Sequence, residues 1–333
     1  MARIYQPTAR NLAHLARVLR RGSLVAIPTE TVYGLAANAL DARACRKIFR
    51  AKGRPTRDPL IVHVGHINQV DALAQFNETA WHLARTFWPG PLTLILPKKP
   101  VVPGVVTAGL DTVALRIPAH QETLWLLHQA RVPLAAPSAN PFGYISPTEA
   151  RHVQENLGRK IAHILDGGPC EHGIESTVVD ARDPKRCVIL RAGAVTAAQL
   201  RAALRGRKVR VASARKRASG RTGLRAPGLL SRHYSPRTPL SLVRSLDGRI
   251  FPHSATGRIF FRKPAGAKRR ENDWWLSARG SLAEAGRRLY AVLREADARG
   301  LRRIEAELAP ATEGTLAEAI NDRLRRASAR RAR

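Results

Sequence analysis

Short apolar runs alternate with amphipathic stretches along the first two hundred residues. The apolar runs predict strands at 24–28, 60–64, 92–96, 112–117, 133–136, 161–165, 177–180 and 187–191. Apolar residues at helical spacing predict helices at 9–21, 42–51, 78–87, 121–130, 147–156 and 196–205. This alternation predicts an α/β domain with a central sheet. Strands 112–117 and 177–180 lack a helix on one side, so we expect a twisted mixed sheet with flanking helices.

The pattern changes at residues 206–238, where Lys and Arg are interleaved with Ser, Gly and Ala. We therefore predict a large first domain at 1–205, a linker or lid at 206–238 and a smaller domain at 239–333. Strands are expected there at 240–243, 257–261 and 302–308, and helices at 281–298 and 314–327. This βα alternation predicts a small Rossmann-like α/β domain, and the absence of a glycine-rich phosphate loop argues against its binding a dinucleotide.

Length and composition favour a folded, two-domain protein without a membrane span. The 333 residues are 44% hydrophobic, and Pro or Gly interrupts the apolar runs before they reach membrane-spanning length. Three widely spaced cysteines, Cys45, Cys170 and Cys187, fit neither a disulfide framework nor a metal site. We interpret them as reduced thiols and expect a cytoplasmic protein. The arginine-rich N-terminus resembles a transit peptide in charge, but Leu12, Leu15 and Leu19 favour a folded amphipathic helix.

The formal net charge of +32 is concentrated in the last third of the chain. Residues 201–333 carry 33 Lys and Arg against 11 Asp and Glu. Such an excess predicts salt-sensitive, non-specific contact with RNA. The same arginines also fit a solvated surface, and no recognised nucleic-acid motif accompanies them.

Three loops following apolar runs carry the candidate chemistry. Hydroxyl-bearing residues follow the first run in Thr29-Glu30-Thr31, and Ser138 and Asn140 follow the run at 133–136. Lys52 and Arg54 lie one residue apart in a turn between Gly and Pro. Open α/β sheets bind ligands at strand ends, so hydroxyls, amides and paired cations there suit an anionic ligand such as a nucleotide.

In this order, the motifs resemble the YrdC family of L-threonylcarbamoyladenylate synthases in its longer two-domain form. The resemblance covers the first two-thirds of the chain closely and the remainder in size and layout. Its motifs are the segments 27–35, 52–55, 59–63, 88–93, 112–118, 137–140, 173–177, 190–193, 226–228 and 233–236.

The resemblance implies a nucleotidyltransferase that makes threonylcarbamoyl-AMP and pyrophosphate from L-threonine, bicarbonate and ATP. ATP would be a substrate bound with Mg²⁺, and no protein metal site is expected. The product would pass to the machinery that builds threonylcarbamoyladenosine in tRNA.

The resemblance also assigns residues to roles. Lys52 and Arg54 would be catalytic. The implied ATP ligands are Lys52, Arg54, Thr112, Ser138, Asn140, Ser146, Arg191 and Tyr234. The implied threonine ligands are Thr31, His63, Arg116, Ala136 and Ser176. From the sequence alone, His63 equally fits a core histidine, and Arg116 fits a paired cation at a sheet end.

Two acids and two other function classes stay open at this point. Asp58 would repel a triphosphate unless Mg²⁺ or Arg57 intervened, and Glu175 fits either a buried structural acid or a catalytic one. The main alternative is a double-stranded RNA or ribosome-associated binding protein that uses the basic surface. A carbamoyltransferase of hydrogenase maturation is disfavoured, because its Cys-x-x-Cys pairs are missing.

Overall fold

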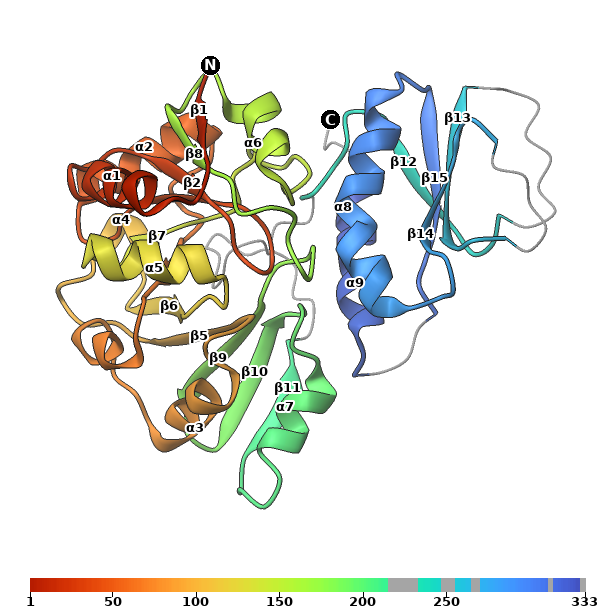
Figure 1. Cartoon of the computed structure of the whole chain (residues 1–333). Helices are drawn as coiled ribbons and strands as arrows, with labels where there is room; N and C mark the ends of the chain where they lie inside the picture. Colours follow the sequence, from red (N-terminus) through yellow and green to blue (C-terminus); the bar gives the residue numbers. More distant parts are fainter. Residues whose placement is uncertain (215–232, 247–254, 265–269, 311–313, 330–333) are drawn as a thin grey trace.

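The computed structural model describes residues 1–214, 233–246, 255–264, 270–310 and 314–329. Their strands form one large and one small sheet, which belong to the two bodies visible in Figure 1. No helix in these ranges is both long and apolar enough to span a bilayer.

The large sheet is mixed. In spatial order its strands are β1 (Arg3–Tyr5), β8 (His163–Leu165), β2 (Val25–Ile27), β3 (Gly34–Asn38), β7 (Leu134–Ala135), β4 (Ile61–His63), β6 (Thr112–Arg116), β5 (Leu92–Pro97), β9 (Thr177–Asp183), β10 (Arg186–Arg191) and β11 (Arg210–Ser213). Parallel pairs such as β4–β6 alternate with antiparallel pairs such as β5–β6. The predicted fold class is confirmed.

Helices connect and cover these strands. They are α1 (Ala9–Arg20), α2 (Ala42–Lys52), α3 (Glu78–Phe87), α4 (Gly104–Thr107), α5 (Gln121–Ala130), α6 (Ala150–Leu157) and α7 (Ala197–Ala203), with a 3₁₀ turn at Ile67–Ala72. The ends of α2 matter most for the site. Asp41 caps its first turn, and Gly53 ends it with φ of +64°. This left-handed turn separates Lys52 from Arg54 and fixes both.

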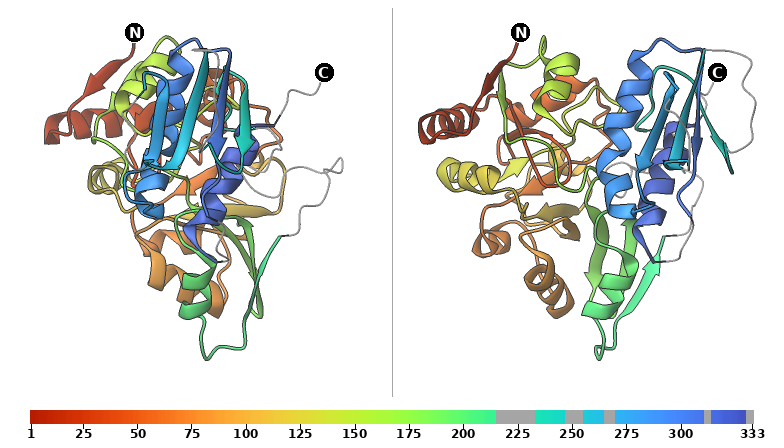
Figure 2. Two further views of the ribbon diagram at one scale, coloured as in Figure 1. Left: turned by 90° about the vertical axis from the view of Figure 1, so that its right-hand side faces the viewer. Right: turned by 45° about the vertical axis from the view of Figure 1, so that its right-hand side comes forward.

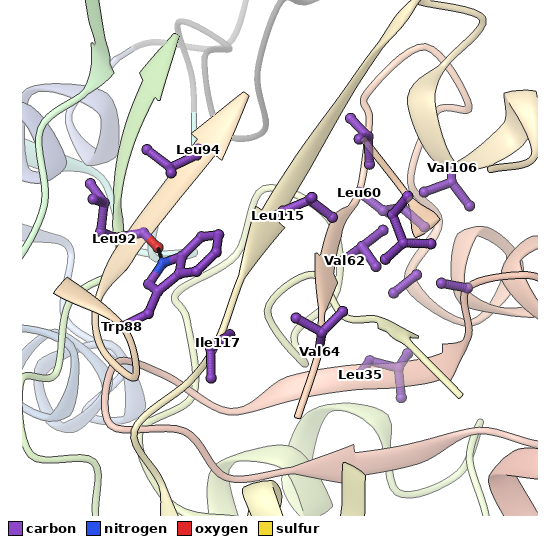
Figure 3. Packing of buried hydrophobic residues seen from close by; sticks show 14 of the residues in the cluster. Leu35, Leu60, Val62, Val64, Trp88, Leu92, Leu94, Val106, Leu115 and Ile117 are labelled. Carbon is purple, nitrogen blue, oxygen red and sulfur yellow. Dashed lines mark hydrogen bonds between the residues drawn. The ribbon is translucent and has the colours of Figure 1, made fainter. Parts of the chain in front are cut away.

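The core beneath the site is formed by apolar side chains of adjacent strands. Leu60, Val62 and Leu115 lie together on one side of β4 and β6 (Figure 3). The indole nitrogen of Trp88 donates a hydrogen bond of 2.6 Å to the carbonyl of Leu92, which satisfies a buried polar group. The strands that end at the site are therefore supported by a packed core.

The small sheet is parallel throughout, in the order β12 (Leu240–Val243), β15 (Arg303–Glu307), β13 (Thr256–Arg262) and β14 (Asp273–Ser277). Helices α8 (Leu282–Ala298) and α9 (Leu316–Ala327) lie between this sheet and the first body (Figures 1 and 2). Val32, Ile145 and Ile174 of the first body join the same apolar cluster as residues of α8 and α9. The two bodies therefore share a core.

Four strands were not expected from the sequence, namely β1, β3, β11 and β14. β3 is made of Gly, Leu, Ala and Asn, which have little strand preference and depend on pairing with β2 and β7. β11 lies inside the predicted linker, where it extends the sheet beside β10. Residues 215–232 of that segment lie outside the described residues.

Candidate active site

The ends of several strands of the large sheet surround a small cavity of about 50 Å³. It is lined by all five predicted threonine ligands, Thr31, His63, Arg116, Ala136 and Ser176, and by four of the predicted ATP ligands, Arg54, Ser138, Arg191 and Tyr234. The lining also includes Thr29, Val32, Gly34, Ile61, Pro137, Glu175 and His233. Segments up to two hundred residues apart therefore meet in one pocket.

Arg116 lies at the carboxyl end of β6 and is 3% exposed. Its Nε donates to the carbonyl of Gly90 at 3.1 Å, and its Nη1 donates to the Thr31 hydroxyl at 3.0 Å. Its Nη2 forms an ion pair of 2.5 Å with Glu30. The guanidinium is thus held in one orientation at the cavity wall, as the recognition of a carboxylate requires.

His63 is the register partner of Arg116 on the neighbouring strand β4. Burial, and then the charge of Arg116, lower the pKa of His63 to about 3. The imidazole is therefore neutral at physiological pH, and its Nδ1 has no partner among the described residues. A neutral ring beside a cation can take part in hydrogen bonds to a ligand without adding repulsion.

Ser176 is held in the pocket by hydrogen bonds with residues of β5 and β10. Its hydroxyl lies 2.8 Å from that of Thr93 and accepts a hydrogen bond of 3.1 Å from Arg191. Arg191 also donates to the Ser176 carbonyl from two nitrogens. These hydrogen bonds fix the side chain of Ser176 in the pocket, next to Arg191.

Lys52 and Arg54 are buried at the cationic side, at 3% and 7% exposure. Lys52 Nζ donates to the carbonyls of Ser138 and Asn140, both at 2.5 Å. Arg54 forms an ion pair of 3.0 Å with Asp58. Burial, and then the charge of Arg54, lower the pKa of Lys52 well below its usual range. A bound anion would reverse this effect by favouring the charged amine.

His233 and Tyr234 cover the cavity from the segment that leads to the second sheet. Tyr234 is 1% exposed and has a φ of +62°, an uncommon conformation for a non-glycine residue. Its ring centroid lies 4.1 Å from that of His233 and 5.6 Å from that of Tyr290 on α8. Within the described part of the chain the Tyr234 hydroxyl has no hydrogen-bond partner, so it is available to a ligand in the cavity.

Glu175 connects this cavity to the second body. Its carboxylate accepts hydrogen bonds from Ser146 at 2.6 Å, from the Tyr290 hydroxyl at 2.9 Å and from Arg323 Nε at 2.9 Å. Burial alone would raise the pKa of Glu175, but Arg323 and Arg191, together with the Ser146 hydrogen bond, lower it to about 2. This carboxylate is therefore ionised and fully engaged, which fits a structural role.

Four predicted ligands do not line the cavity. Lys52 lies behind the Ser138 loop, and Ser146 is bonded to Glu175. Asn140 is 1% exposed and donates to the carbonyls of Pro141 and Tyr144, so it shapes its own loop. Thr112 is the first residue of β6. Because it is four residues before Arg116, the two side chains lie on the same face of the sheet, but Thr112 does not reach the cavity.

No metal site is preformed in the described ranges, where no group of three His, Cys, Asp or Glu could hold an ion. The acids closest to the cations are already engaged, Asp58 with Arg54 and Glu175 with Arg323. These residues therefore do not fit a protein-held metal.

Sequence reasoning missed three partners of the site. Glu30 lies within a quoted motif, but nothing local indicated that it would pair with Arg116. Tyr290 and Arg323 come from the second body, more than a hundred residues after Glu175, and reach it only through the packing of α8 and α9. Only a signal linking distant positions could have found them.

These features define an α/β protein whose strand-end pocket combines a fixed guanidinium with a separate cluster of cations. Two family models match the chain, one described as "Telomere recombination" over residues 17–193 and one as "Threonylcarbamoyl-AMP synthase, C-terminal domain" over residues 195–329. The chain belongs to the Sua5/YciO/YrdC family, in its two-domain form.

Relatives and solved structures agree with this family. The threonylcarbamoyl-AMP synthase of Pyrococcus abyssi is 41% identical, over 94% of this chain and 92% of the relative. That of Bacillus subtilis is 44% identical, over 72% and 68%. The crystal structure of P. abyssi Sua5 complexed with L-threonine matches with a TM-score of 0.85 and 37% identity, covering 98% of both chains. These relatives are named as synthases, so they do not favour the RNA-binding alternative.

Proposed function

We propose that this chain is a threonylcarbamoyl-AMP synthase, which makes its product and pyrophosphate from L-threonine, bicarbonate and ATP. The observation that carries the proposal is the pocket itself. It places a fixed guanidinium, Arg116, in one cavity with a second group of buried cations, Arg54 and Arg191. An amino acid and a nucleotide are the pair of anions that such a pocket suits.

The reaction joins three substrates in two balanced steps. The neutral amine of threonine and bicarbonate give an N-carboxylate and water. An oxygen of this carboxylate attacks the α-phosphorus of ATP, the bond from that phosphorus to the bridging oxygen breaks, and pyrophosphate leaves with the electron pair. The protein needs no nucleophile of its own. Its task is to hold two anions together and neutralise the leaving group.

The threonine side consists of Arg116, Thr31, His63, Ala136 and Ser176. Arg116 binds the carboxylate, while the hydroxyls and the neutral His63 are available for hydrogen bonds to the amine and side-chain hydroxyl. A wall that contacts the threonine methyl should disfavour serine by about 10–200-fold, the usual range for one methyl group.

The nucleotide side consists of Lys52, Arg54, Ser138, Arg191 and Tyr234. Arg54 and Arg191 add guanidinium charges at the cavity wall, and Lys52 adds a positive charge behind the Ser138 loop. Thr112, Asn140 and Ser146 remain predicted ligands, with Thr112 on the same sheet face as Arg116 but outside the cavity lining. Mg²⁺ enters with ATP as part of the substrate, bound to phosphate oxygens.

The segment carrying His233 and Tyr234 acts as a lid. The cavity of about 50 Å³ is far smaller than the 300–1,000 Å³ typical of small-molecule sites, so ATP requires an opening movement. A second cavity of about 970 Å³ is lined by Ser235–Leu242, the residues that directly follow His233 and Tyr234, and gives this segment room to move. Closure over the adenylate shields it from water.

The product is passed, in the cytoplasm, to the machinery that builds threonylcarbamoyladenosine in tRNA. The test of the proposed function is mass-spectrometric detection of threonylcarbamoyl-AMP formed by the purified full chain. Product should require ATP, threonine and bicarbonate together. Pyrophosphate release at the full rate without an amino acid would contradict the proposal.

A further inference from the structure

A second cationic cavity lies on the first body, away from the small sheet. It is formed by the outer face of α2, the Ser23-Leu24 segment before β2 and the turn before β8, and its volume is about 500 Å³. Figure 1 shows α1, α2 and β8 on the side of the molecule opposite to β12–β15. The cavity is lined by Ser23, Leu24, Lys47, Arg50, Ala51, Lys160, Ile161, Ala162 and His163.

Three cations from separate segments meet around this cavity without an acid in its lining. Lys47 and Arg50 are one turn apart on α2, so they share a face. Lys160 comes from the turn after α6. Lys47 Nζ donates to the Gly22 carbonyl at 2.6 Å, which fixes its amine at the cavity edge. No carboxylate in the described ranges pairs with any of these three side chains.

The surrounding sequence adds charge of the same sign. Residues 42–57 contain seven Lys and Arg and no acid, and residues 1–29 contain no acid at all. Asp41, the acid that directly precedes α2, is engaged in capping that helix. An exposed charge cluster on a convex surface is solvated at little cost. These cations instead surround a hollow that Leu24, Ala51 and Ile161 also line, so their like charges are gathered around one cavity.

We propose that this cavity binds a small anion bearing more than one phosphate group. The cavity volume falls within the 300–1,000 Å³ of typical ligand sites. A single phosphate would fill only part of it. Two ammonium groups and one guanidinium fork match phosphate oxygens. Pyrophosphate and the triphosphate end of a nucleotide share this chemistry. The proposal is independent of the proposed function, because none of these residues lines the active-site cavity.

Calorimetric titration with pyrophosphate tests the proposal on the full chain. To remove binding at the active site, the titration is made in the Lys52→Ala/Arg54→Ala background. One site should remain there, and adding Arg50→Gln and Lys160→Gln should weaken it at least 10-fold, because two charge-assisted contacts to phosphate are lost. Both side chains are exposed, so these changes should leave folding intact, and thermal unfolding checks this.

The control carries Arg279→Gln and Arg302→Gln instead, two exposed arginines of the second body. It makes the same change in net charge and should retain binding. ATP and a single-stranded RNA oligonucleotide, added as competitors, identify the source of the phosphate. Displacement of pyrophosphate by ATP at low concentration supports a small ligand. The proposal would be overturned if the control lost as much pyrophosphate affinity as the Arg50→Gln/Lys160→Gln variant. It would also be overturned if the Lys52→Ala/Arg54→Ala background bound no pyrophosphate, or if the cavity bound RNA but not pyrophosphate.

Discussion

The two sides of the active-site pocket are built differently. On the threonine side, Arg116 is held by Glu30, Thr31 and Gly90, all from the first body. On the nucleotide side, Glu175 and Tyr234 contact Tyr290 and Arg323 of α8 and α9. We infer that the first body alone preorganises threonine recognition, whereas the second body and the lid complete nucleotide recognition.

The largest effect is expected from removing the buried cations. Lys52→Ala/Arg54→Ala should lower kcat/KM for ATP by about 10²- to 10⁴-fold, because two charge-assisted contacts of about 1.5–3 kcal/mol each are lost. Threonine affinity, measured by calorimetry, should change little, because neither side chain belongs to the Arg116 network. Normal activity of this variant would refute the assignment of the nucleotide side.

Breaking the contact between the two bodies should cost stability. Arg323→Met leaves the Glu175 carboxylate buried without its cation and should destabilise the chain by about 3–5 kcal/mol. Denaturant unfolding measures this. Adding Glu175→Gln should recover part of the loss, because the unpaired charge is removed. A double variant less stable than Arg323→Met would argue against the ion pair as the cause.

The matching change on the threonine side is Arg116→Ala. It should weaken threonine binding by about 10–150-fold, equivalent to one charge-assisted contact of about 1.5–3 kcal/mol, with ATP binding largely retained. Calorimetry with each substrate separates the two effects. Arg131→Ala, an exposed arginine of the same body, serves as the control. If ATP affinity falls as much as threonine affinity, the pocket does not have two distinct sides.

The last effect concerns pH. The pKa of Glu175 is about 2 in the folded chain, below the ordinary value of 4.5. The depressed pKa adds stability that is present above pH 4.5 and is lost as pH falls toward 2, up to about 3 kcal/mol. Unfolding free energies at a series of pH values should therefore fall more steeply below pH 4.5 for the wild type than for Glu175→Gln. Parallel curves would contradict the ionised state of Glu175.

The threonine side of the pocket was easier to predict from the sequence than the nucleotide side. Strands with strong apolar patterns, such as β4, β5 and β6, were predicted correctly, and β4 and β6 end at His63 and Arg116. β3 was missed because its formation depends on pairing with β2 and β7 more than on its own composition. All five predicted threonine ligands line the cavity, because local motifs at strand ends place them there.

The nucleotide side was harder to predict because its geometry depends on long-range packing. Lys52 and Arg54 stood out as a charged pair in a turn, but the sequence did not indicate that Lys52 would be buried against the Ser138 and Asn140 carbonyls. Glu175 gave no sign of its partners, since Tyr290 and Arg323 lie on helices of another body. Their contact arises from the shared apolar core around Val32, Ile145 and Ile174.

The most direct test of this two-sided account is threonine affinity in the Arg323→Met variant, at a temperature where the variant remains folded. The account predicts a threonine Kd within about twofold of wild type, while the KM for ATP rises by about tenfold or more, equivalent to at least one hydrogen-bonding contact. A threonine Kd that rises as much as the KM for ATP would contradict it, because the second body would then organise both sides of the pocket.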